Sequence, residues 1–161
     1  MNKAQNLSNP IHKSFDIAAV TTYRSGVLQA RAWRTIKRLT DDWLREYGIT
    51  TAQWVVIGMV HDSGKQGIRI TDLAKQTDTT LSFLTHTVNL LESKSILTRV
   101  EHASDSRAKM VRMADHYTKT CKQIEAELSE KLAATLYSKV SKADLHTYVK
   151  VLFAFSDLTK D

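Results

Sequence analysis

Apolar residues recur at spacings of about three, four and seven along most of this chain, which is the pattern of amphipathic α-helices. The only proline is Pro10, so no proline interrupts the later stretches. The pattern predicts a mainly α protein. Its helices are expected over about 15–47, 51–63, 71–76, 79–92 and 115–139, and from 141 onward.

The pattern changes in the second half of the chain, where apolar and polar residues alternate one by one. Alternation is typical of a half-buried strand, and it occurs in two runs, 96–100 and 108–113. We therefore predict a small β-hairpin with Ser104–Arg107 at its tip. Because the hairpin follows two short helices, this region is predicted to be a winged helix-turn-helix, a module that places one helix in a DNA groove.

The predicted elements form one continuous domain. Residues 1–13 are expected to be a flexible leader, and residues 50–114 the winged helix-turn-helix lobe. The flanking regions, 14–49 and 115–161, are long helices whose apolar faces are too extensive for the small lobe to cover. Pairing with a second copy would bury these faces at about 25 cal/mol per Å² of apolar area. The flanking regions are therefore expected to be dimerisation helices of a homodimer.

The helix predicted at 79–92 carries an apolar stripe on one face and no acidic residue before Glu92. The stripe is predicted to face the core and consists of Leu81, Leu84, Val88 and Leu91. Hydroxyl, amide and imidazole groups on the other face suit hydrogen bonds to base edges, and an asparagine there can pair with adenine. The alternative is a solvated helix with a chance run of threonines. The residues predicted for the major groove are Thr79, Ser82, Phe83, Thr85, His86 and Asn89, with Thr87 beside them.

Charged residues mark the predicted hairpin as a second contact with DNA. Arg107 lies at the tip, and arginine is favoured in a narrow minor groove, where the negative potential is enhanced. Asp105, two residues earlier, can hold the guanidinium by a charge-assisted hydrogen bond. Lys109, Arg99 and Arg112 flank the tip and are expected to meet phosphates. The alternative for this segment is a solvated charged turn.

Composition agrees with a partner that is a polyanion. The formal net charge is +6 at pH 7, and a basic surface gains affinity by releasing the counterions of phosphates. The first residues have no apolar segment of a signal peptide, and no stretch reaches the ~18 apolar residues of a membrane span. The only cysteine, Cys121, cannot form an internal disulfide. We expect a soluble cytoplasmic protein.

Catalytic and metal-binding patterns are missing from the sequence. It has no nucleophile–base pair, no glycine-rich phosphate loop and no Cys/His cluster, so we expect no enzyme activity, no cofactor and no metal site. A long-range site made by His102, His116 and an acid stays open. Cys121 is expected to be a packing residue rather than an oxidant sensor. A reactive thiol needs cationic neighbours that lower its pKa, and the only cationic residues close to Cys121 in sequence are Lys119 and Lys122.

Taken together, these residues resemble the MarR-type (multiple antibiotic resistance regulator) winged-helix transcription factors. The resemblance covers about residues 15–158 in helix order. Three positions depart from the family pattern: His86 and Ser106 stand where arginine is frequent, and Ser95 stands where a glycine usually ends the recognition helix. The matching segments are Gln53-Trp54, Leu73-Ala74, Ser82 to Glu92, Ile96-Leu97-Thr98-Arg99 and Asp105-Ser106-Arg107-Ala108.

The resemblance implies a symmetric dimer whose two recognition helices enter successive major grooves of a pseudo-palindromic operator. It also implies a small-molecule pocket between the dimerisation helices and the DNA-binding lobe, often for aromatic or phenolic acids. The residues expected to border that pocket are Arg34, Trp54, Met59, Met113 and Tyr117.

The sequence is therefore interpreted as that of a sequence-specific double-stranded DNA-binding regulator. We expect a homodimeric repressor that a small-molecule or stress signal releases from its operator. The alternatives are a winged-helix protein-interaction module and a nonspecific DNA-binding protein.

Overall fold

The structure is a computed structural model, which describes residues 21–102 and 105–157; for 102, 105–108 and 157 it describes the backbone alone. The predicted leader, 1–13, lies outside the described residues. The chain divides into two units, residues 1–39 and 40–161. In the first unit the described part is the beginning of α1 (Thr22–Leu44), and none of the described residues before Thr40 is buried.

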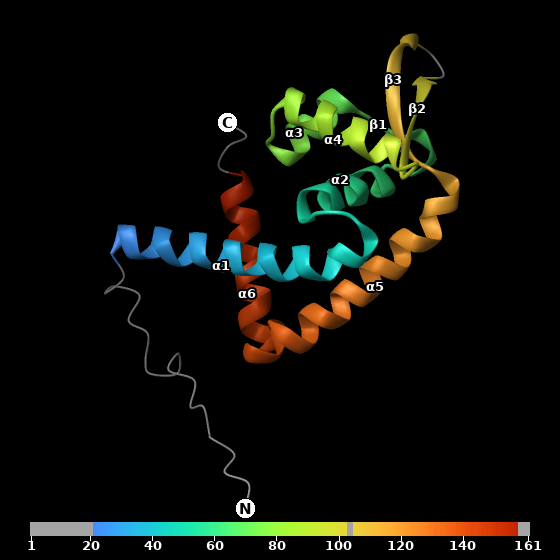
Figure 1. Ribbon diagram of the computed structural model, residues 1–161. Helices are drawn as coiled ribbons and strands as arrows, with labels where there is room; N and C mark the ends of the chain where they lie inside the picture. Colours follow the sequence, from blue (N-terminus) through green and yellow to red (C-terminus); the bar gives the residue numbers. More distant parts are fainter. Residues whose placement is uncertain (1–20, 103–104, 158–161) are drawn as a thin grey trace, which may run out of the picture. The chain divides into compact units, whose positions relative to one another are not determined.

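The second unit contains the end of α1 and all later elements, and it confirms the predicted helices and hairpin (Figure 1). Short 3-10 turns follow α1, α2 and α5 and precede α5. In chain order the elements after α1 are η3 (Arg45–Tyr47), α2 (Thr51–Asp62), η4 (Gly64–Gln66), β1 (Ile68–Arg69), α3 (Ile70–Thr77), α4 (Leu81–Ser93), β2 (Leu97–His102), β3 (Asp105–Met113), η5 (Asp115–Tyr117), α5 (Thr118–Thr135), η6 (Tyr137–Lys139) and α6 (Lys142–Asp157).

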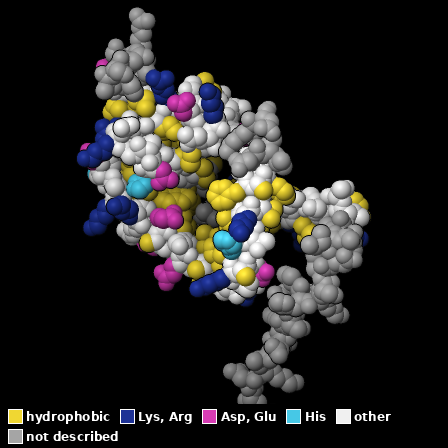
Figure 2. Space-filling view, turned by 180° about the vertical axis from the view of Figure 1, so that it is seen from behind, with side chains coloured by type: hydrophobic (Ala, Val, Ile, Leu, Met, Phe, Trp, Pro, Cys, Tyr) yellow, Lys and Arg dark blue, Asp and Glu magenta, His cyan; other side chains and the backbone are white. Residues whose placement is uncertain are grey.

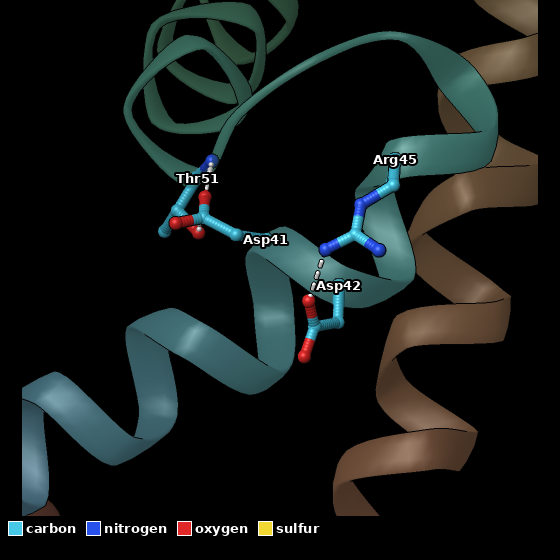
Figure 3. A network of polar contacts seen from close by, with 4 residues as sticks. All are labelled: Asp41, Asp42, Arg45 and Thr51. Carbon is cyan, nitrogen blue, oxygen red and sulfur yellow. Dashed lines mark hydrogen bonds and ion pairs between the residues drawn. The ribbon is translucent and has the colours of Figure 1, made fainter.

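The junction between α1 and α2 is held by hydrogen bonds at the start of α2. Thr50 and Gln53 form a reciprocal capping box, which satisfies two backbone N–H groups that the helix itself cannot pair. One carboxylate oxygen of Asp41 accepts both the backbone N–H and the hydroxyl of Thr51, each at 2.7 Å (Figure 3). These bonds fix where α2 begins after the left-handed turn at Gly48.

The core of the second unit lies between α2, α3, α4, α5 and the sheet. Fully buried side chains come from each of these elements, so the helix-turn-helix pair α3–α4 is packed on a continuous apolar base. Removing a large buried side chain from such a core costs about 2–5 kcal/mol. The largest fully buried side chains are Leu44, Ile57, Leu73, Leu84, Leu91, Ile124, Val56, Val60, Val88 and Val111.

The sheet has three antiparallel strands in the order β1-β3-β2. Ile68 and Arg69 lie in none of the elements predicted from the sequence, but they form strand β1, which pairs with β3 through Ile68–Val111 and Arg69–Met110. The hairpin strands are also longer than expected: Asp105–Arg107 belong to β3, with His102 paired to Asp105, so Ser104–Arg107 is not simply a turn. Backbone pairing continues beyond the apolar alternation, because polar residues can form a ladder as well as apolar ones.

Two polar contacts connect η3 to α5. The Tyr47 hydroxyl donates to a carboxylate oxygen of Glu127 at 2.6 Å, and Lys131 lies 3.3 Å from Glu46. The hydrogen bond to Glu127 is the largest cause that raises the pKa of Tyr47 to about 12, and the same bond is the largest cause that lowers the pKa of Glu127.

The last helix, α6, is capped by Ser141, whose hydroxyl accepts the backbone N–H of Asp144. Its side chains from Lys142 to Ser156 are all exposed except that of Leu145, which is half-buried. Hydrophobic side chains therefore reach the surface, as the face drawn in Figure 2 shows. Those of α6 are Tyr148, Val149, Val151, Leu152, Phe153 and Phe155.

Candidate nucleic-acid interface

Helix α4 presents one face to the core and the other to solvent. Its N-terminus is capped by Thr80, whose hydroxyl accepts the backbone N–H of Phe83 at 3.2 Å. The buried face consists of Leu84, Thr87, Val88 and Leu91, which recur at spacings of three and four residues. This packing fixes the rotation of the helix about its axis, and with it the identity of the exposed residues.

Two residues of α4 were assigned to the wrong face by the sequence pattern. Leu81 was expected in the core stripe, but it is the first residue of the helix and its side chain is 49% exposed. Thr87 was expected beside the base-facing residues, but its side chain is 4% exposed. The Thr87 hydroxyl donates to the carbonyl oxygen of Phe83 at 2.9 Å, so the polar atom is satisfied while the methyl group packs in the core.

All six residues predicted for the major groove are exposed in the structure. Some of their polar atoms have local partners: the Thr85 hydroxyl donates to the Leu81 carbonyl oxygen at 2.8 Å, and the hydroxyls of Thr79 and Thr77 lie 2.8 Å apart. The sequence interpretation missed the exposed apolar side chains on this helix, Leu81 and Leu90. The six predicted residues that are exposed are Thr79, Ser82, Phe83, Thr85, His86 and Asn89.

The end of α4 is a left-handed turn at Ser95. Ser95 has φ = +57°, and the next backbone N–H, that of Ile96, donates to the carbonyl oxygen of Leu91 at 2.9 Å. This 6→1 hydrogen bond is that of a Schellman motif, in which glycine is the usual residue at the left-handed position. The helix therefore ends as it would with glycine, but serine adopts the unfavourable backbone conformation.

The wing places its basic residues on two faces. Arg99 is paired with the buried Val111, whereas Arg112 is paired with Thr98, the next position along β2. Because side chains alternate along a strand, Arg99 and Arg112 lie on opposite faces of the hairpin and do not form one surface. Lys109 is exposed and is two residues from Val111, on the same face as Arg99.

The two arginines also have different partners. Arg99 forms an ion pair with Glu92 and donates to the side-chain oxygen of Asn89, both on α4. Arg112 lies 3.8 Å from Asp115 and lines a hollow of about 200 Å³ together with Lys65. The side chains of Asp105 and Arg107 lie outside the described part of the structure, although their backbone belongs to β3.

A further basic residue lies near the wing and was not singled out in the sequence. Arg69 lines a hollow of about 230 Å³ with Ile70, Thr71 and Lys109. Arg69 comes immediately before α3, and the strand that contains it is only two residues long. No periodic signal exists in so short a strand, so only its pairing with β3 shows that Arg69 approaches Lys109.

The residues expected to border a ligand pocket are not brought together in the second unit. Trp54 lines a hollow of about 410 Å³ with Gly58, Cys121 and others, whereas Met113 lines the separate hollow that contains Arg112. His61 borders both hollows. The remaining second-unit residues, Met59 and Tyr117, are packed against the core.

The fifth expected pocket residue, Arg34, belongs to the first unit. There it borders a hollow of about 500 Å³ in α1 with Arg31, Thr35 and Arg38. Three arginines at spacings of three and four residues make this part of α1 a positively charged face.

Cys121 is 4% exposed and packs in the core, which confirms its expected place as a packing residue. Burial is the largest cause that raises the pKa of its thiol, and the carboxylates of Glu125 and Asp62 raise it further. Within the described residues no group of three or more His, Cys, Asp and Glu side chains is placed to hold a metal ion. The side chain of His102 lies outside them. No helix in the described ranges has the length and apolar content to span a membrane.

Comparison with known proteins finds a family whose sequence model matches part of this chain and whose solved structures share its fold. The sequence model of the MarR family matches residues 47–108, which include α2, α3, α4, β2 and the start of β3. A mutant MarR from E. coli complexed with operator DNA has a TM-score of 0.74 and 21% identity, covering 84% of this chain and 99% of that one. The MepR–DNA complex of S. aureus has a TM-score of 0.73 and 21% identity, covering 86% and 98%.

A ligand-bound structure shows the same fold. CouR from Rhodococcus jostii, bound to p-coumaroyl-CoA, has a TM-score of 0.72 and 14% identity, covering 81% of this chain and 90% of that one. At these identities the likeness to solved structures is one of fold, while the sequence match is to the family itself. The chain therefore has the fold of MarR-family structures, and its winged helix-turn-helix segment, residues 47–108, matches the sequence model of the MarR family.

Proposed function

We propose that this chain is a sequence-specific, double-stranded DNA-binding transcriptional regulator of the cytoplasm, acting by binding and not by catalysis. The observation that carries the proposal is the exposed face of α4, which has no acidic side chain between Leu81 and Leu91. That face stands on a buried core stripe, so its side chains are presented in a fixed orientation. A helix held in this way can read base edges in a major groove.

The proposed base-contacting residues are the six predicted from the sequence, all of them exposed: Thr79, Ser82, Phe83, Thr85, His86 and Asn89. Lys109 is proposed to contact phosphates, because it is cationic and exposed on the face of the hairpin that carries Arg99. Arg107, with Asp105, is proposed for the minor groove on the basis of its position in the sequence of the wing. Arg112 lies on the other face of the hairpin from Arg99, so we propose no DNA contact for it.

A homodimer is part of the proposal. Its support is the exposed apolar side chains of α6, together with those of α1 in the first unit, such as Trp33 at 57% exposure. Unpartnered apolar faces of this kind mark association surfaces, and a two-fold dimer presents two copies of α4 to a pseudo-palindrome. Deletion of residues 141–161 is expected to give unstable or monomeric protein; a stable dimer in light scattering would contradict this assignment.

Repression and release by a signal complete the proposal. The hollow beside Trp54 and Cys121 has room for a small aromatic or phenolic effector, and the structure of CouR bound to p-coumaroyl-CoA supports an effector of this type. An effector releases DNA only if it binds more tightly to the conformation that does not fit the operator.

The test is fluorescence anisotropy with the full chain on DNA from upstream of its own gene and on a scrambled duplex of equal length. The measurement is repeated over a salt series. We expect tighter binding to the upstream duplex than to the scrambled one. The affinity should fall steeply with rising salt concentration, because phosphate contacts release counterions. Weak and equal binding to both duplexes would instead favour a protein-interaction module or a nonspecific DNA-binding protein.

A further inference from the structure

The wing and α4 are connected by one arginine that touches a residue of the proposed reading face. Arg99 Nη2 donates to Asn89 Oδ1 at 2.8 Å, and Arg99 Nη1 forms an ion pair with Glu92 on the next turn of α4. The Arg99 and Glu92 side chains are only 27% and 25% exposed, whereas Asn89 is exposed. The guanidinium is therefore held between a partly shielded carboxylate and a solvent-facing amide.

The chemistry of arginine decides which way the amide of Asn89 is turned. A guanidinium has N–H donors and no acceptor, so it can bond only to the amide oxygen of Asn89 and never to its NH2 group. The orientation of the amide thus follows from its partner. With the oxygen turned toward Arg99, the NH2 group and one lone pair of the oxygen remain to meet another molecule.

This orientation changes what Asn89 can recognise. Pairing with adenine requires an amide that accepts from adenine N6 and donates to adenine N7 at the same time. Guanine instead presents two acceptors, O6 and N7, along its major-groove edge. An asparagine whose oxygen accepts from Arg99 keeps two N–H donors and one free lone pair beside a positive guanidinium, an arrangement that favours the two acceptors of guanine over the N6 donor of adenine.

We propose that Arg99 is a positioning residue that turns Asn89 into a hydrogen-bond donor, so that Asn89 reads a guanine in each half-site of the operator. The inference rests on the proposed DNA-binding function and specifies one contact of the same site. It replaces the expectation from the sequence that Asn89 pairs with adenine. Glu92 has a supporting role, because its ion pair fixes the guanidinium that holds the amide.

The experiment measures anisotropy of the full chain on a panel of operator duplexes in which each base pair is substituted in turn. The position read by Asn89 is the one whose preference disappears in Asn89→Ala. At that position wild type is expected to prefer guanine over adenine by about tenfold, the ratio for one good base-edge contact. Arg99→Met is expected to reduce that preference to about twofold or reverse it.

Arg112→Met is the matched control, because it removes the same charge from the opposite face of the same hairpin, at a residue that is 28% exposed against 27% for Arg99. It is expected to keep the guanine preference. If Arg99→Met does not fold, Asn89→Asp is the variant that tests the inference. Aspartate still accepts from Arg99 but has no donor, so it is expected to lose the guanine preference.

The outcomes separate this inference from the proposed function. If wild type selects no sequence, the proposed function fails. If wild type is selective but prefers adenine at the Asn89 position, the inference is wrong. The inference is also wrong if Asn89→Ala changes no base preference. It is wrong as well if either Arg99→Met or Asn89→Asp keeps the guanine preference of wild type.

Discussion

Replacement of Gly67 by alanine tests the close approach of β1 to β3 at the base of the wing. A Cβ on Gly67 would lie 2.5 Å from the carbonyl oxygen of Val111 and 2.7 Å from Cγ of Arg112. The backbone at Gly67 has φ = 74° and ψ = −172°, a region that is open essentially to glycine alone. Both the backbone and the new methyl group must therefore shift in Gly67→Ala.

The expected loss follows from these two causes. A non-glycine residue in such a backbone conformation costs about 1–3 kcal/mol, and forcing a methyl group into occupied space costs about 1–3 kcal/mol more. We expect Gly67→Ala to lower the free energy of unfolding by about 3 kcal/mol or more. Gly58→Ala is the matched control: Gly58 lies inside α2 with no atom within 4 Å of the new Cβ. That change is expected to raise the free energy of unfolding by about 0.5–1 kcal/mol.

The assay is urea unfolding followed by far-ultraviolet circular dichroism, with all variants at the same protomer concentration because dimerisation contributes to stability. The reasoning would be refuted if Gly67→Ala unfolded within about 0.5 kcal/mol of wild type, the range typical of neutral surface changes. It would also be refuted if Gly58→Ala proved the more damaging of the two.

Three further predictions follow from individual residues. Ser95→Gly should raise the free energy of unfolding by about 0.5–1 kcal/mol in the same assay, because glycine adopts the left-handed turn after α4 without strain; a loss of stability would contradict this. Tyr47→Phe removes the hydrogen bond to Glu127 and should lower the free energy of unfolding by a constant amount between about pH 5 and 9. This range lies between the ordinary pKa values of the glutamate and the tyrosine, and the loss should shrink outside it. Because the pKa of Glu127 is lowered in the folded protein, the stability that Glu127 contributes is lost as the pH falls below 4.5. Because the pKa of Tyr47 is raised to about 12, the stability that Tyr47 contributes is lost as the pH rises from 10 to 12. An equal loss of unfolding free energy in Tyr47→Phe at pH 3 and pH 7 would exclude this coupling. Arg107→Ala should weaken DNA binding by about 1–3 kcal/mol without altering dimerisation, and equal operator affinity for the variant and wild type would remove Arg107 from the interface.

Much of the fold could be predicted because its elements carry periodic apolar patterns. Helices α2, α4 and α5 and the hairpin strands place side chains in the core, and Leu84, Val88 and Leu91 are buried as the apolar pattern predicts. The short strand β1 could not be predicted as part of the sheet, since two residues carry no period. Its pairing depends on Gly67, whose missing side chain lets the two backbones meet.

The sequence predicted which helix carries the candidate site, but it did not predict for every side chain of that helix whether it is buried or exposed. Thr87 was misplaced because a threonine can bury its methyl group while its hydroxyl bonds to the preceding turn. The contact between Arg99 and Asn89 joins residues ten positions apart on different elements. The residues that line the hollows of the second unit likewise come from elements distant in sequence, so no local pattern predicts which of them share a cavity.

The central claim is that the exposed face of α4 reads DNA sequence. Its most direct test is the ratio of dissociation constants for scrambled and operator DNA, measured at one salt concentration for wild type and for a variant with Ser82, His86 and Asn89 all replaced by alanine. These side chains are exposed, so the substitutions should leave the core intact. The account predicts that the ratio falls by about a hundredfold or more, while the affinity for scrambled DNA changes by about twofold at most. An unchanged ratio would contradict the account, as would an equal loss of affinity on both duplexes.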